Sequence, residues 1–98
     1  MPKERKPCFL CGRYAYTERH HVFGGTANRR LSEEDGMVVD LCPDCHNRPP
    51  NGVHFNKERM EKLHRIGQQT WENIQTAKGI THDEARKAFM QRYGKNYL

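Results

Sequence analysis

The chain has 98 residues, of which 35% are hydrophobic and 30% are charged, so it can form one small domain with a thin core. A net charge of +5 suits a polyanionic partner. The sequence has no apolar run of the ~20 residues that a transmembrane helix needs. Its charged N-terminal segment lacks the apolar stretch of a secretory signal. We therefore expect a cytoplasmic protein that does not enter membranes.

The first half of the chain predicts short extended segments. Residues 14–16 and residues 20–23 are expected to be extended, the second run ending at a pair of glycines. Residues 26–36 are polar and are predicted to form a long loop. Residues 37–41 are apolar and β-branched, which predicts a strand. This strand can pair with residues 20–23 as a hairpin across the loop.

Three helices are predicted after the hairpin. Pro43 suits the first turn of a short helix that carries His46. A longer helix is expected over residues 56–76, where Asn56 is a good N-cap and apolar residues recur at three- and four-residue steps. The capping box that begins at Thr81 opens a last helix, which Gly94 closes.

Four cysteines form two Cys-x-x-Cys knuckles, Cys8 with Cys11 and Cys42 with Cys45. A two-residue gap lets both sulfurs of a tight turn bind one ion, and two such pairs are typical of a four-thiolate structural zinc site. Two disulfides, or a redox-active pair, are the alternatives. A disulfide within a knuckle would close a small strained loop, and no signal sequence indicates an oxidising compartment.

The chain is rich in histidine. His64 and His82 lie on charged helical stretches and are expected to be solvated surface residues. The other four adjoin a knuckle, the hairpin or a glycine turn: His20, His21, His46 and His54. Neighbouring side chains of a strand point to opposite faces, so one member of the His20–His21 pair can bind a metal while the other handles a proton.

These motifs resemble the HNH endonuclease family in its zinc-stapled form. The resemblance is carried by Glu18-Arg19-His20-His21-Val22 with Gly24-Gly25 and by Asp40-Leu41-Cys42-Pro43-Asp44-Cys45-His46. Gly52-Val53-His54-Phe55-Asn56 and the closing Gly94-Lys95-Asn96-Tyr97-Leu98 are similar to a short phage-type branch.

The resemblance implies an α+β fold, with a small ββα-metal core, a four-cysteine zinc site and two C-terminal helices. It divides the chain into a basic, flexible arm (1–7), an HNH domain with zinc knuckles (8–56) and a helical extension packed on the core (57–98). The expected function is a metal-dependent endonuclease that hydrolyses DNA phosphodiester bonds. The alternative is an inactive zinc module of the same fold that binds nucleic acid or a phage protein partner.

The resemblance also implies residue roles. His21 matches the general base that takes a proton from water, and Glu18 resembles an acidic residue that supports this region. His20, His46 and His54 match the ligands of a catalytic divalent ion, which could be Mg²⁺, Mn²⁺, Ni²⁺ or Zn²⁺. An ordinary histidine, with a pKa near 6.5, is available as a base at neutral pH.

The chain departs from the family pattern at two places. Met37 stands where the family has its middle asparagine, which braces the hairpin loop, and Asn28 is a candidate replacement. His46 and His54 are eight residues apart with two prolines between them, so His54 has to reach the ion from the loop or from the second helix.

Three arginines are predicted to line the hairpin and its loop: Arg19, Arg29 and Arg30. They would contact phosphates, which positions a duplex without reading bases, or they are plain surface charge. An ion placed against the minor groove, as in the family, predicts low sequence preference. One such unit has a small footprint on nucleic acid, which a homodimer or a phage protein partner would extend.

Overall fold

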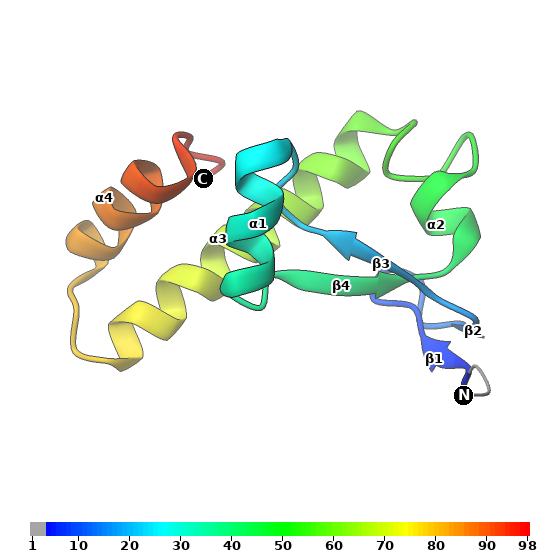
Figure 1. Cartoon of the computed structure of the whole chain (residues 1–98), viewed down its shortest axis with the longest axis horizontal. Coiled ribbons are helices and arrows are strands. Elements are labelled where there is room, and N and C mark those ends of the chain that lie inside the picture. Colours follow the sequence, from blue (N-terminus) through cyan, green and yellow to red (C-terminus); the bar gives the residue numbers. More distant parts are fainter. Residues whose placement is uncertain (1–3) are drawn as a thin grey trace.

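The computed structural model describes residues 4–98 and shows a small α+β protein. Within these residues it has two antiparallel two-stranded sheets and four helices, arranged as in Figure 1. No helix in this part of the chain is both long enough and apolar enough to cross a bilayer.

The first sheet flanks the first cysteine knuckle. Strand β1 (Lys6–Pro7) pairs with β2 (Tyr14–Ala15), with Lys6 opposite Ala15. The last two residues of the predicted arm are therefore part of a sheet, whereas residues 1–3 of that arm lie outside the described residues. The pairing brings the two ends of the first knuckle together.

The second sheet is the predicted hairpin. Strand β3 (Glu18–His21) pairs with β4 (Val38–Leu41), with His20 opposite Val39. The backbone N–H of Val22 extends the pairing by donating to the carbonyl oxygen of Met37 at 3.0 Å.

The segment predicted as a long loop is largely a helix, α1 (Thr26–Glu34), so this prediction was wrong. Gly25 precedes the helix without a side-chain cap, and the helix starts with no acidic residue, so neither usual sign of a helix start is present. A tertiary contact fixes it instead. The buried Ser32 hydroxyl accepts the backbone N–H of Phe23 and donates to the carbonyl oxygen of Phe23, both at 3.1 Å.

The other three helices begin and end close to their predicted positions. The side chain of Asn56 accepts the N–H of Arg59 at 3.1 Å, and Thr81 accepts the N–H of Glu84 at 3.2 Å. Gly94 ends the last helix in the left-handed conformation, with φ of 74°. The three helices are α2 (Pro43–Asn47), α3 (Lys57–Ala77) and α4 (His82–Tyr93).

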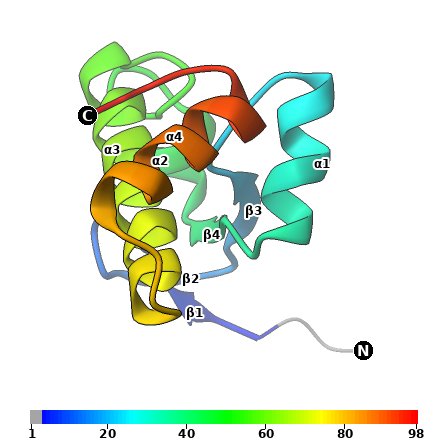
Figure 2. The ribbon, with the colours of Figure 1, turned by 90° about the vertical axis from the view of Figure 1, so that its left-hand side faces the viewer.

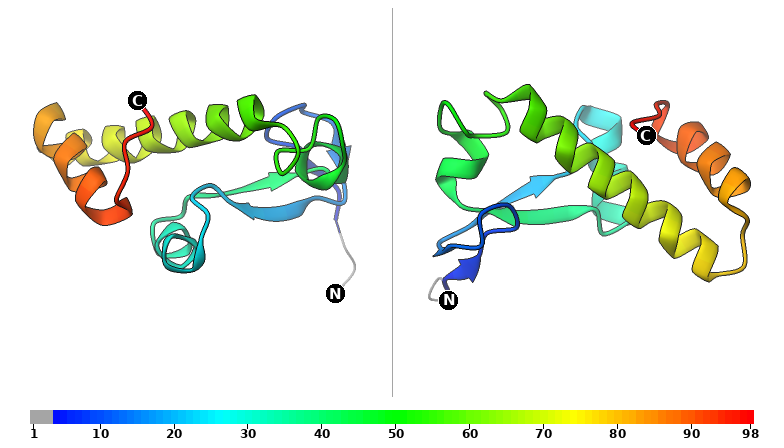
Figure 3. Two further views of the ribbon diagram at one scale, coloured as in Figure 1. Left: turned by 90° about the horizontal axis from the view of Figure 1, so that it is seen from above. Right: turned by 180° about the vertical axis from the view of Figure 1, so that it is seen from behind.

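Helix α3 crosses the hairpin on one side, and α4 folds back beside α3 at the far end (Figures 1 and 3). Figure 2 shows α1 on the other side of the hairpin from α3. The chain after α4 returns to α3, where the backbone N–H of Tyr97 donates to the side chain of Gln68 at 2.7 Å.

Two clusters of buried side chains form the core. The first lies between the knuckles and the start of α3 and consists of Cys8, Leu41, Cys42, Cys45, Val53 and Leu63. The second joins the hairpin to the C-terminal helices and consists of Val22, Phe23, Met37, Trp71, Phe89 and Tyr93.

Candidate functional site

The four cysteines form one cluster, called here the cysteine cluster. Their sulfur atoms all lie within 4.8 Å of one another, and all four are free thiols. Three are buried and Cys11 is exposed. Four convergent sulfurs are a donor set that suits zinc, so the cluster is positioned to hold a structural metal ion.

The hairpin brings the two knuckles together. The backbone N–H of Phe9 donates to the carbonyl oxygen of Asp40 at 2.8 Å, which ties the first knuckle to the end of β4. The second knuckle follows β4 directly. Directly after the first knuckle, Gly12 has φ of 78° and its N–H donates to the carbonyl oxygen of Cys8 at 2.9 Å, so the turn needs a residue that tolerates this backbone conformation.

The pKa values of two of these thiols shift in opposite directions. Burial raises the pKa of Cys8, but hydrogen bonds from backbone N–H groups, including that of Cys11, outweigh it and lower the pKa to about 6. Burial, followed by the neighbouring thiols, raises the pKa of Cys45 to about 12. Four thiolates this close repel one another, and a bound divalent cation would remove that cost.

Three histidines from separate segments form a second cluster, the histidine cluster. His20 comes from β3, His46 from α2 and His54 from the loop before α3, and one ring nitrogen of each lies within 4.8 Å of the others. The Nε2 atoms of His46 and His54 are 3.2 Å apart. The structure thus brings together all three residues that the family resemblance gave as ligands, with His54 reaching the cluster from the loop.

The chemistry of His20 fits a cation. Its Nε2 atom is buried and has no hydrogen-bond partner among the described residues. Burial, followed by the charges of His46 and His54, lowers its pKa to about 4, so the ring is neutral at neutral pH. A buried polar atom without a partner is costly, and a metal ion bound there would satisfy its lone pair.

Glu18 orients the second member of the histidine cluster. Its Oε1 atom lies 2.8 Å from Nδ1 of His46, while Nε2 of the same ring faces the cluster. Metal-binding histidines commonly donate their other ring N–H to a carboxylate, which fixes the ring and makes it a better ligand. The predicted supporting residue therefore touches the ring of His46.

His21 is not a member of the histidine cluster, because successive side chains along β3 point to opposite faces. Its Nε2 atom lies 2.8 Å from Oε2 of Glu33, and Arg19 donates to the other carboxylate oxygen at 2.8 Å. These hydrogen bonds, that of Arg19 first, lower the pKa of Glu33, which is therefore a carboxylate at neutral pH.

Sequence reasoning missed Glu33. It lies on α1, which was predicted as a loop, and its partner His21 is twelve residues away. Asn28, the suggested replacement for the family's asparagine, donates instead to the backbone carbonyl of Tyr93 at 3.2 Å, and Met37, which stands at the asparagine position, is buried in the core. No local pattern marks Glu33, because only the fold of α1 places it there.

The histidine cluster opens into a hollow of about 500 Å³, called here the histidine hollow. His20, His21, His46 and His54 all line it, together with Arg19 and Arg29. The third predicted arginine, Arg30, is not part of its lining and instead pairs with Glu34 at 3.3 Å. The hollow therefore combines imidazoles with guanidinium groups.

The expectation for His64 was wrong, although His82 is exposed as predicted. His64 is partly buried on α3. The centroid of its ring lies 4.4 Å from the ring centroid of Tyr97 and 6.1 Å from that of Phe23. Burial, followed by the charge of Lys95, lowers its pKa. The returning C-terminal segment covers it, which the helical pattern alone does not reveal.

No family model, no curated protein and no solved structure matches this chain. The two clusters and the histidine hollow are therefore the features that bear on its function.

Proposed function

We propose that this chain is a metal-dependent endonuclease of the HNH type, which hydrolyses phosphodiester bonds in DNA. One observation carries the proposal: three histidine nitrogens converge beside an additional histidine, His21, in a single hollow that arginines line. A cation site, a base and phosphate-binding groups are the components that phosphodiester hydrolysis needs.

His20, His46 and His54 would hold the divalent ion. When bound, it would neutralise charge on the scissile phosphate and on the leaving oxygen. Neutral imidazoles suit this role because they leave the ion its full positive charge. The hydrogen bond that Nδ1–H of His46 donates to Glu18 would keep the ring in the orientation that metal binding needs.

His21 would act as the general base. With its Nε2–H donated to Glu33, the neutral ring has Nδ1 as the nitrogen that can accept a proton from water. Glu33 would also stabilise the imidazolium that forms, and Arg19 holds the carboxylate in place. This contact supports turnover even though Met37 replaces the bracing asparagine of the family.

The cysteine cluster would have a structural role in this enzyme. The short helix α2 carries both Cys45 and His46, so an ion bound by the thiols would also fix one ligand of the histidine cluster. We therefore assign the two clusters different tasks, one in shaping the domain and one in chemistry.

The proposal is tested with supercoiled plasmid. The zinc-loaded chain is incubated alone and with Mg²⁺, Mn²⁺, Ni²⁺ or added Zn²⁺, and nicked and linear forms are measured over time. We expect ion-dependent nicking that His21→Ala reduces by about 10²- to 10⁴-fold, the usual contribution of a general base. His82→Ala, an exposed histidine on α4, is the matched control and should retain activity.

The second candidate is the inactive module, which the methionine at position 37 favours. Plasmid that stays supercoiled with every ion, combined with tight, salt-sensitive binding, would establish this module and reject the enzyme.

A further inference from the structure

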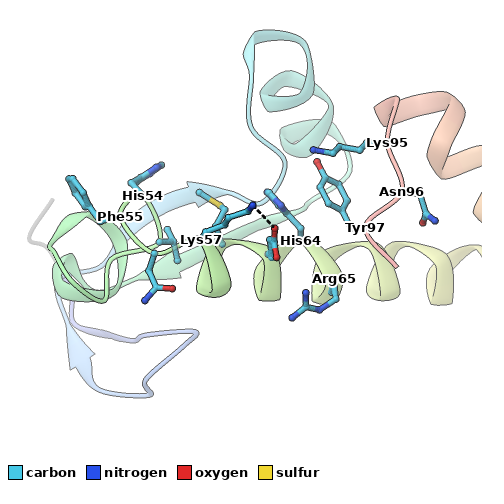
Figure 4. Close-up of a pocket in the computed structure, with 12 residues that line it drawn as sticks. His54, Phe55, Lys57, His64, Arg65, Lys95, Asn96 and Tyr97 are labelled. Atoms are coloured by element: carbon cyan, nitrogen blue, oxygen red, sulfur yellow. Dashed lines mark ion pairs between the residues drawn. The ribbon is translucent and has the colours of Figure 1, made fainter.

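A second hollow opens next to the histidine hollow. It has a volume of about 730 Å³ and lies between the loop before α3, the first half of α3 and the C-terminal segment (Figure 4). We call it the basic hollow. Four residues line both hollows and form the wall between them: His54, Met60, His64 and Tyr97. A ligand bound in one hollow can therefore continue into the other.

The basic hollow has an excess of positive charge. Lys57, Arg65 and Lys95 line it, against one carboxylate, that of Glu61. Glu61 lies 3.9 Å from the Lys57 ammonium and is its ion-pair partner. Within residues 4–98, Arg65 and Lys95 have no carboxylate partner, so their charges are free to bind an anion.

Aromatic rings lie at both ends of the basic hollow. Phe55 directly follows His54, and 58% of its surface is exposed, so its ring is accessible to a ligand. At the other end, the ring of Tyr97 lies 5.4 Å from the Lys95 ammonium. Figure 4 shows Phe55 beside His54 at one end, and Lys95 and Tyr97 towards the other.

We propose that the basic hollow binds an unpaired stretch of one nucleic-acid strand, which leads away from the histidine cluster. This proposal rests on the proposed function, because the bound strand would be the one whose phosphate lies at that cluster. Cations spaced along a groove follow a phosphate backbone, and exposed rings stack on bases. Bases within a duplex are already stacked on each other, so the ring of Phe55 favours an unpaired strand.

Binding is measured without cleavage. The full zinc-loaded chain, with no other divalent ion added, is titrated into a fluorescein-labelled oligonucleotide of about 12 nucleotides, within the usual range of strand-binding sites. The same sequence as a blunt duplex is titrated in parallel, and each anisotropy titration is repeated at several salt concentrations. We expect the single strand to bind more tightly than the duplex.

Two variants and two matched controls locate the site. Phe55→Ala should weaken strand binding by about fivefold or more, as expected for one lost base–ring stack. Lys95→Gln should weaken it and reduce the salt slope by about 0.7, the value for one phosphate contact on a single strand. Tyr14→Ala, an exposed ring on β2, and Lys87→Gln, an exposed cation on α4, should leave both quantities unchanged.

The outcomes separate this proposal from the endonuclease. Unchanged strand binding in both variants, or equal binding of strand and duplex, would overturn the strand site even if the plasmid is nicked. Loss of strand binding in the variants supports the strand site even if the plasmid stays intact, in which case only the endonuclease fails. Both substituted side chains are exposed, and circular dichroism with zinc analysis checks that the variants fold.

Discussion

Two carboxylates contact imidazoles of the candidate site, one at a member of the histidine cluster and one at His21. Glu18 binds Nδ1 of His46, and Glu33 binds Nε2 of His21, each at 2.8 Å. Each contact fixes which ring nitrogen stays free, and that choice determines what the histidine can do. At the residue scale, the proposed site would therefore depend on two acids that are not themselves proposed as metal ligands.

In the proposed endonuclease Glu33 would position His21, so its removal should affect kcat more than KM. We expect Glu33→Ala to lower kcat by roughly 10- to 100-fold, part of the total that a general base contributes. Glu33→Gln should retain more activity than Glu33→Ala, since the amide oxygen still accepts the Nε2–H of His21. Steady-state cleavage kinetics measure both variants. Glu34→Ala, on the same helix, is the control, and equal loss in all three variants would contradict the assignment.

Asp35 should make the folding stability of this protein depend on pH. It accepts hydrogen bonds from Trp71 at 2.9 Å, from Arg92 at 2.8 Å and from the Tyr93 hydroxyl at 2.6 Å. Burial raises its pKa, but the hydrogen bonds from Arg92, Tyr93 and Trp71 outweigh it, so the pKa lies below the ordinary value of 3.8. A carboxyl group whose pKa is lowered by folding stabilises the fold at pH values above its ordinary pKa. This stabilisation is lost as the pH falls through the lowered pKa.

We therefore expect Asp35→Asn to reduce the free energy of unfolding by about 1–3 kcal/mol at pH 7, as for a lost charged hydrogen-bond acceptor. The difference between variant and parent should shrink as the pH falls below 3.8. Urea unfolding, followed by tryptophan fluorescence at pH 7 and at a pH below 3.8, measures this difference. Asp83→Asn, exposed at the start of α4, should change stability by less than about 0.5 kcal/mol.

Helix α3 is the element that joins the two core clusters and lines both hollows. It packs directly on the end of the hairpin at Gly67, where a Cβ atom would lie 2.5 Å from Cγ1 of Val22 and 3.0 Å from Cζ of Phe23. Both partners belong to the segment that follows His21. The absence of a side chain at position 67 therefore sets how close α3 approaches the site.

Gly67→Ala tests this close approach. Alanine favours a helix over glycine by about 1 kcal/mol, but overpacking against the buried Val22 and Phe23 should cost ~1–3 kcal/mol. We expect a net loss of stability, seen as a lower urea midpoint with an unchanged slope. Lys62→Ala, exposed on the same helix, should stay within about 0.5 kcal/mol of the parent, and a stabilised Gly67→Ala would contradict the packing argument.

The molecule as a whole is divided between a thiol-rich end and an aromatic end. Three of the six buried residues in the first core cluster are cysteines, whereas the second cluster is formed mainly by aromatic and aliphatic side chains. An ion bound by the cysteine cluster would therefore replace much of the hydrophobic core at one end. The histidine cluster depends on that end, because α2 supplies both Cys45 and His46.

If the cysteine cluster holds a structural metal, its removal should unfold the thiol-rich end. The apparent binding energy of zinc in small domains, ~10–16 kcal/mol, is as large as the whole stability of a typical domain, ~5–15 kcal/mol. We expect one equivalent of tightly bound metal in the purified chain, and loss of cooperative unfolding after chelation or in Cys42→Ser. Elemental analysis and thermal melts measure this, and a cooperative melt in metal-free protein would disprove the role.

The sequence alone determined those features that local physics controls. The two-residue spacing of each knuckle, the caps Asn56 and Thr81 and the period of α3 need no information from elsewhere in the chain, and the predicted elements agree with the structure. The β-branched run before Cys42 likewise marked a strand of the hairpin.

Only the tertiary structure decided the rest. Helix α1 has no cap and few apolar residues, so its local preference is weak, and the contact between Ser32 and Phe23 fixes it. That helix then brings Glu33 to His21, and the returning C-terminal segment covers His64 with Tyr97. These contacts join residues that are distant in the chain, and their energy exists only after the hairpin and α3 have packed.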